Sequence, residues 1–159
     1  MATSLFRRQP RLDIPHCWIS PSPVLQAYPK ETVIAEKLEA LTALGLLNSR
    51  MKNYYDLAVL SRMYSFQAEH LLEAIMATFR HRDTRIDTEP IGLTEAFYAD
   101  PAREIQWRAF VRRSRFTKEP RDLERLVAEV RSFVFPLLAA AAVGEKPFKA
   151  RWDAGGPWK

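Results

Sequence analysis

The sequence is poor in the residues that form disulfides and bind soft metals. It contains one cysteine and three histidines among 159 residues. The lone Cys17 excludes a disulfide within the chain and suits a reducing cytoplasm. His16 lies next to Cys17, and two adjacent ligands without a further cluster do not have the spacing of a metal site. We therefore predict a cytoplasmic protein and assign no metal ligand.

Long apolar runs are also missing. No window approaches eighteen consecutive apolar residues, and the N-terminus lacks the apolar core of a secretion signal. The sequence therefore predicts neither a membrane span nor a signal peptide. A hydrophobic content of 47% with 27% charged residues is typical of a globular protein, and 159 residues suffice for one domain.

Prolines crowd the N-terminal part of the chain, whereas the rest has helical periodicity. Four prolines within residues 1–27 forbid a long helix there, so we expect an extended arm. Residues 28–159 are expected to form one helical domain. The predicted fold class is mainly α, a bundle of about six helices behind the arm. The predicted helices span residues 30–44, 50–64, 67–80, 93–98, 101–113 and from about 120 onward.

The apolar pattern also predicts which side of each helix is buried. Glu36 and Glu39 should lie on the outer, solvated face of the first helix. Asp100 followed by proline is a start signal for the helix at 101–113. Its apolar face is expected to contain Ala102, Ile105, Ala109 and Phe110. Pro136 should kink or break the last helix, and the aromatic residues of the tail should pin it across the bundle.

One lysine lies where the first helix should be apolar. If this helix starts near Lys30 and turns by about 100° per residue, Lys37 falls inside the apolar stripe. A buried ammonium group is costly unless a partner compensates it. Three explanations are open: the ammonium reaches water along the stripe, pairs with a carboxylate, or points into a cleft that holds a phosphate.

Asp56 is the carboxylate that the chain can bring to this lysine. A short turn through Gly45 and Asn48 makes the first two helices antiparallel neighbours, so Lys37 and Asp56 can meet across the hairpin. Asp56 can alternatively pair with Lys52, four residues earlier in the same helix.

Residues 28–57 resemble a known family. They read Tyr-Pro-Lys-Glu-Thr-Val-Ile-Ala-Glu-Lys-Leu-Glu-Ala-Leu, then a glycine turn, then Asn-Ser-Arg-Met-Lys-Asn-Tyr-Tyr-Asp-Leu. This pattern resembles the C-terminal half of the AbiEii/AbiGii nucleotidyltransferase toxin family. The resemblance extends from about residue 21 to the end of the chain.

The resemblance implies an activity and a site. Family members look like polymerase-beta-type transferases that move a nucleotide from a nucleoside triphosphate, with Mg²⁺, onto an acceptor such as a tRNA. Lys37 matches the lysine that contacts the phosphates, and Asp56 matches the acid of the downstream motif; both are candidate catalytic residues. The candidate nucleotide-binding residues are Lys37, Arg50, Lys52 and Asn53.

The sequence departs from the family pattern upstream of Lys37. In such enzymes paired carboxylates behind a Gly-Ser turn hold Mg²⁺. Residues 1–27 contain Asp13 as their only acid and no glycine. Asn53 stands where most relatives have an aspartate. We therefore expect a truncated component of a toxin–antitoxin or phage-defence system that is inactive alone, with an antitoxin or a missing N-terminal half as partner.

Two further interpretations stay open. The chain can instead be a non-catalytic helical module, or a gene remnant, that binds a partner. Its formal charge is +5, and residues 103–125 carry eight basic against four acidic side chains. This excess can follow a nucleic-acid backbone or form an ordinary solvated face.

Overall fold

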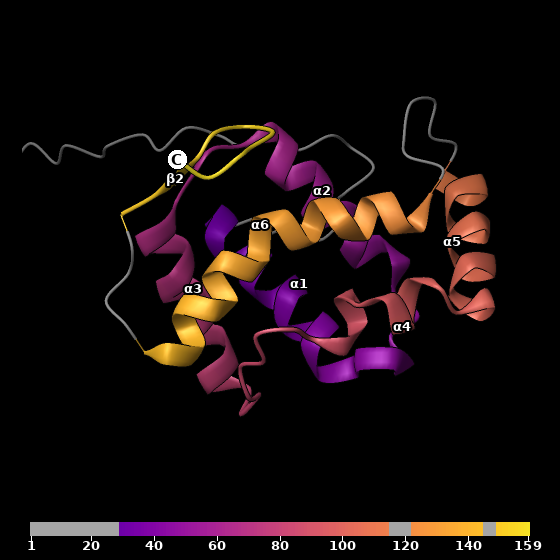
Figure 1. Cartoon of the computed structure of the whole chain (residues 1–159), viewed down its shortest axis with the longest axis horizontal. Coiled ribbons are helices and arrows are strands. Elements are labelled where there is room, and N and C mark those ends of the chain that lie inside the picture. Colours follow the sequence, from indigo (N-terminus) through magenta and orange to yellow (C-terminus); the bar gives the residue numbers. More distant parts are fainter. Residues whose placement is uncertain (1–28, 115–121, 145–148) are drawn as a thin grey trace, which may run out of the picture.

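The computed structural model describes residues 29–114, 122–144 and 149–159. Within these ranges the fold is mainly α, as predicted (Figure 1). The predicted arm, residues 1–27, lies outside the described residues. The helices are α1 (Lys30–Leu44), α2 (Met51–Met63), α3 (Ala68–His81), α4 (Glu95–Tyr98), α5 (Pro101–Ser114) and α6 (Leu123–Val143). The short elements are the 3₁₀ turns η2 (Gly45–Leu47) and η3 (Ile91–Leu93) and the strands β1 (Phe66–Gln67) and β2 (Arg151–Trp152).

Local signals in the sequence set the ends of these helices. α1 ends at Gly45, whose φ of 50° is a conformation that disfavours side chains. α5 starts at the predicted signal, where the Asp100 side chain accepts a hydrogen bond from the Ala102 amide at 2.9 Å. The Asp122 side chain caps α6 in the same way through the Glu124 amide. The predicted helices therefore exist, with ends that differ by a few residues.

Helix α6 is the core helix of the bundle. Its buried face packs against α2 and α3 and is made by apolar residues, among them Leu126, Val130, Phe133 and Leu137. The helix continues through Pro136 and bends without breaking, as Figure 1 shows. Among the described helices, α6 is long and apolar enough to cross a membrane by length and composition alone. Burial of its apolar face inside the bundle accounts for that composition.

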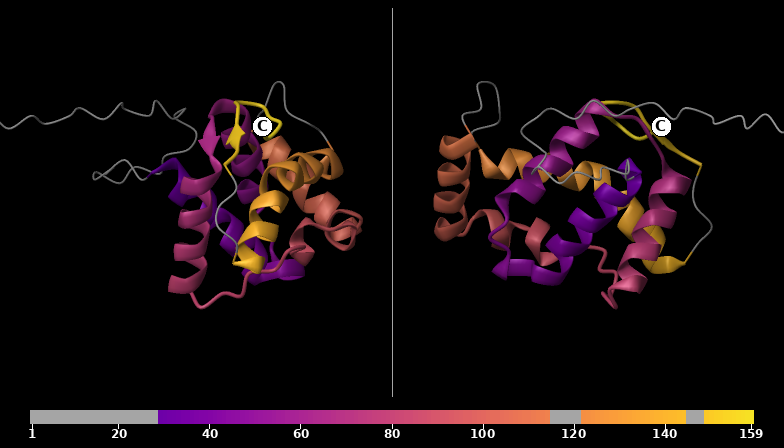
Figure 2. Two further views of the ribbon diagram at one scale, coloured as in Figure 1. Left: turned by 60° about the vertical axis from the view of Figure 1, so that its left-hand side comes forward. Right: turned by 180° about the vertical axis from the view of Figure 1, so that it is seen from behind.

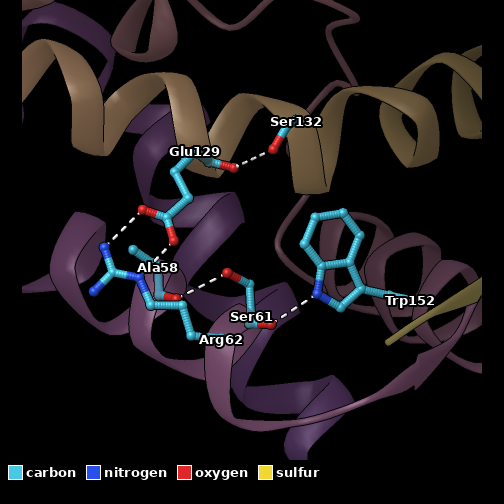
Figure 3. A network of polar contacts seen from close by, with 6 residues as sticks. All are labelled: Ala58, Ser61, Arg62, Glu129, Ser132 and Trp152. Carbon is cyan, nitrogen blue, oxygen red and sulfur yellow. Dashed lines mark hydrogen bonds and ion pairs between the residues drawn. The ribbon is translucent and has the colours of Figure 1, made fainter. Parts of the chain in front are cut away.

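The C-terminal segment closes the bundle over the end of α2. Strand β2 pairs antiparallel with β1, and the carbonyl of Ser61 near the end of α2 accepts two hydrogen bonds. One comes from the Trp152 indole at 2.7 Å, which Figure 3 shows, and the other from the Gly155 amide at 2.9 Å. The Trp158 indole donates to the carbonyl of Phe133 in α6. The tail aromatics thus pin the segment across the bundle, as predicted.

One ion pair joins α2 to the core helix beside this closure. The Arg62 guanidinium donates to both carboxylate oxygens of Glu129 in α6, at 2.5 and 2.6 Å (Figure 3). Such a two-point contact fixes direction as well as distance. Helix α2 is therefore held at its C-terminal end both by the tail and by α6.

Two predictions about helix faces are wrong. Glu39 is not on a solvated face: it is 4% exposed and accepts hydrogen bonds from Arg82 at 2.8 Å and Thr84 at 2.6 Å. These partners lie beyond α3, and the loop that carries them folds back onto α1. In α5 the buried residue is Trp107, whereas Ile105 is 68% exposed. The indole offers the larger apolar area, so α5 turns that side inward.

Candidate functional site

The side chains of Lys37 and Asp56 meet across the α1–α2 hairpin, as the sequence predicts. The Lys37 ammonium lies 2.6 Å from the Asp56 carboxylate. Asp56 is 1% exposed, whereas the Lys37 side chain is 21% exposed. The turn that makes this meeting possible consists of η2 and residues 48–50, after which α2 returns beside α1.

Lys52 pairs with the same carboxylate from within α2. Its ammonium contacts both oxygens of Asp56, at 3.0 and 2.8 Å, one helical turn away. The two pairings that the sequence leaves as alternatives are therefore both present. We call Lys37, Lys52 and Asp56 the two-lysine cluster.

The two-lysine cluster has an excess of positive charge that reaches the surface. One buried carboxylate balances one of the two ammonium groups, so the three side chains carry a net charge of about +1 at neutral pH. The Lys52 side chain is 50% exposed and that of Lys37 is partly exposed. Asp56 accepts hydrogen bonds from both ammonium groups, and both lysine side chains remain partly exposed. An anion such as a phosphate can therefore reach the solvent side of the cluster.

The other two candidate nucleotide-binding residues lie beside the cluster in the chain. Arg50 is exposed just before α2, and its backbone amide donates to the Asn48 side chain at 2.9 Å. Asn53 is half-buried in the first turn of α2. Among the described residues, neither side chain hydrogen-bonds to the cluster. The structure thus brings together Lys37, Lys52 and Asp56 and leaves Arg50 and Asn53 at its border.

The described residues do not fit a magnesium site at this place. Both oxygens of Asp56 already accept hydrogen bonds from ammonium groups. Within the described ranges no group of three or more His, Cys, Asp or Glu side chains is placed to hold a metal ion. Because Mg²⁺ requires several oxygen ligands, the described residues of the cluster do not fit it.

A polar contact that the sequence did not predict lies at the base of the hairpin. The Tyr54 hydroxyl, buried inside α2, donates to the carbonyl of Gly92 at 2.7 Å. Burial raises the pKa of Tyr54 well above its usual value, against smaller opposing effects of Asn48 and Arg103. Gly92 packs against Leu41 and Tyr54 so closely that a side chain there would lie 3.0 Å from a backbone oxygen. The partner of Tyr54 comes from 38 residues away, so the periodicity of α2 gives no signal for this contact.

A family comparison identifies relatives of the chain. Residues 4–129 match the model of the nucleotidyl transferase AbiEii toxin, a type IV toxin–antitoxin system. The chain belongs to this family. No curated protein and no solved structure matches it.

The AbiEii match includes both halves of the hairpin and ends inside α6. It therefore covers the whole two-lysine cluster, whereas the closing C-terminal segment lies beyond it. Membership in a nucleotidyltransferase toxin family points to a nucleoside triphosphate as substrate and to an antitoxin as partner, and it is compatible with use of a divalent metal.

Proposed function

We propose that this chain is the nucleotide-binding part of an AbiEii-type nucleotidyltransferase that works in the cytoplasm. Lys37 and Lys52 bind phosphate oxygens of a nucleoside triphosphate, and Asp56 holds both lysines in position. Arg50 and Asn53 border the nucleotide. The observation that carries the proposal is one buried carboxylate that anchors two partly exposed lysines.

The chemical role of the two lysines is electrostatic. Nucleotidyl transfer builds charge on the phosphoryl oxygens, and ammonium groups already in place stabilise that charge without reorganising. Lys37 is the better placed of the two, because its bond to Asp56 is the shorter and its side chain the less exposed. A tRNA is the acceptor that we propose, since the resemblance of residues 28–57 extends to enzymes of this kind.

Magnesium in this proposal is held by carboxylates other than those of the described residues. Upstream of Lys37 the sequence has three acids, Asp13, Glu31 and Glu36. The next acid downstream, Glu39, is already hydrogen-bonded to Arg82. None of these forms the paired carboxylates behind a Gly-Ser turn that the family pattern requires. We therefore propose that the chain alone does not turn over. Incorporation of labelled nucleotide into tRNA by this chain with Mg²⁺ alone would refute that statement.

To test whether Lys37 binds phosphate, we would measure binding of ATP, without metal, to Lys37→Met and to the unchanged protein. Loss of one charge-assisted contact should weaken binding about 10- to 100-fold. Lys149→Met, which removes an exposed lysine of the C-terminal segment, is the matched control and should bind normally. Lys37→Arg should recover part of the affinity. Equal affinities of Lys37→Met and the unchanged protein would contradict the proposal.

A second candidate function, a non-catalytic module that binds a partner, is favoured by one surface feature. The described chain has seven exposed large hydrophobic residues, and four of them gather at one end of the hairpin: Leu44, Leu46, Leu47 and Ile91. Ile91 packs over Gly45, which joins η3 to the consecutive leucines. An apolar patch of this kind often marks an interaction surface. If ATP binding is absent and Leu47→Asp abolishes binding to a co-expressed antitoxin, this second function holds.

A further inference from the structure

Helix α5 has one side in the bundle and the other in solvent. Trp107 is buried, and Phe110 packs half-buried against α2. The opposite side carries Arg108, Arg112 and Arg113, all exposed. In Figures 1 and 2 the helix stands at one end of the molecule, seen both from the front and from behind. We call the exposed side, defined by these three arginines, the arginine face.

The arginine face concentrates the charge of the protein. Helix α5 contains four arginines and one glutamate, a net charge of +3, while the whole chain has a formal net charge of +5. Arg103 serves the fold, because its guanidinium donates to backbone carbonyls of Leu46 and Asn48. The other three arginines are left on the surface of α5.

The single acid of α5 does not neutralise this face. Glu104 accepts a hydrogen bond from Arg108 at 2.7 Å, one turn along the helix, where the Arg108 side chain is 75% exposed. An exposed ion pair of this kind contributes little free energy and is readily exchanged for another anion. Arg108 can therefore leave Glu104 for a phosphate at small cost.

The side of α5 opposite the arginine face packs against α2. The Phe110 ring is 5.9 Å from the ring of Tyr55, and Tyr55 is the neighbour of Asp56 in α2. Helices in contact have axes about 8–10 Å apart, so α5 is the next helix to the one that carries Lys52 and Asp56.

We propose that the arginine face binds the sugar–phosphate backbone of a nucleic acid. Guanidinium groups bind phosphate oxygens in pairs and remain charged at every physiological pH. Ile105 is the one large apolar residue of α5 that is exposed, and a single residue is too little to form the apolar core of a protein interface. That the bound strand is the acceptor of nucleotide transfer rests on the proposed function; the binding itself does not.

The test uses a fluorescent single-stranded RNA of about 20 nucleotides and measures anisotropy, without nucleotide or metal, over a range of salt concentrations. The variant combines Arg108→Gln, Arg112→Gln and Arg113→Gln. The matched control removes three exposed basic residues elsewhere with Arg80→Gln, Arg85→Gln and Lys149→Gln. Both variants lose the same charge, so only the position of the charge differs. Far-UV circular dichroism checks that each variant is folded.

The expected result is a loss of affinity confined to the α5 variant. At low salt it should bind RNA at least about tenfold more weakly, and its plot of log K against log salt should be shallower by about 2, since each phosphate contact contributes about 0.7. An equal loss in the control variant would show binding to net charge alone and would overturn the proposal. So would stronger binding to polyglutamate than to RNA, which would indicate an acidic protein partner.

Lys37→Met separates this inference from the proposed function. If the variant loses ATP binding and keeps RNA binding, the two sites act as described. If the unchanged protein binds RNA through the arginine face but does not bind ATP, the proposed function fails while the arginine face stands. If no RNA binds at low salt, the arginine face fails whatever the result with ATP.

Discussion

Replacing Asp56 by asparagine tests the electrostatics of the two-lysine cluster most directly. The change keeps the shape of the side chain and removes the charge that both lysines share. Hydrogen bonds to charged groups each contribute about 1.5–3 kcal/mol, and a buried charge partner that is removed leaves the other uncompensated. Lys52 is half exposed and recovers much of its hydration, whereas Lys37 is 21% exposed and recovers less. We expect a loss of about 2–4 kcal/mol in the free energy of unfolding.

The two lysines should differ in what they contribute. Lys37→Met leaves Asp56 buried but still paired with Lys52, so the expected cost is about 1–2 kcal/mol. Lys52→Met removes a half-exposed ammonium from a carboxylate that Lys37 still pairs, and a pair of this spacing within one helix is typically worth about 0.5 kcal/mol. The order of destabilisation is therefore Asp56→Asn, then Lys37→Met, then Lys52→Met.

Urea unfolding at neutral pH, followed by tryptophan fluorescence and far-UV circular dichroism, measures these differences. The midpoint of Asp56→Asn should fall by about 1 M or more at an unchanged slope. Coincident transitions in the two signals are the control for two-state behaviour. A midpoint within experimental error of the unchanged protein would refute the buried cluster, and so would a larger effect of Lys52→Met than of Lys37→Met.

Three further substitutions test the fold around the cluster. Tyr54→Phe should lower the free energy of unfolding by about 1 kcal/mol at neutral pH. Burial raises the pKa of Tyr54, so the unchanged protein loses stability as the pH rises above about 10, and the variant should lose less. Urea unfolding at pH 8 and pH 11 measures both effects. Glu39→Gln should cost about 1–3 kcal/mol because it removes the charge that faces Arg82, and thermal unfolding at low and high salt measures this. Trp152→Phe should free one lone pair of the Ser61 carbonyl, and hydrogen exchange should speed up at the end of α2.

Each of these has an outcome that contradicts it. The stability advantage of the unchanged protein over Tyr54→Phe should be larger at pH 8 than at pH 11. An advantage that grows with pH would contradict the argument from the raised pKa. Glu36→Gln is the comparison for Glu39 in the same helix. The Glu36 carboxylate lies 3.8 Å from the same Arg82 but its side chain is 44% exposed, so its loss should cost less than the loss of Glu39. Uniform exchange along α2 in Trp152→Phe would show that the closure does not hold its end.

The sequence predicts local features well because they depend on nearby residues. The bounds of α1 follow from its apolar period and from Gly45, and the meeting of Lys37 with Asp56 follows from a short turn between two antiparallel helices. Both predictions need only helical geometry and a loop so short that the second helix must return beside the first. The resemblance at residues 28–57 adds the chemistry, which periodicity does not contain.

Features that depend on distant partners are the ones that sequence reasoning missed. Glu39 has its partners 43 and 45 residues later, in a loop whose path no periodicity describes. α5 is apolar on two sides, so its sequence alone does not tell whether Ile105 or Trp107 faces the core. The packing of α2 beside α5 decides this, and that packing depends on the assembled bundle.

The closure of α2 by the C-terminal segment has a consequence for synthesis of the chain. Trp152 follows Ser61 by 91 residues, so the last turn of α2 is made long before the indole that caps it. At about 5–20 residues per second, translation takes roughly 5–18 s to cover that interval. During this interval the C-terminal end of α2 in the nascent chain lacks the partner that caps it. A chaperone that shields this end of α2 would therefore act while the chain is still on the ribosome.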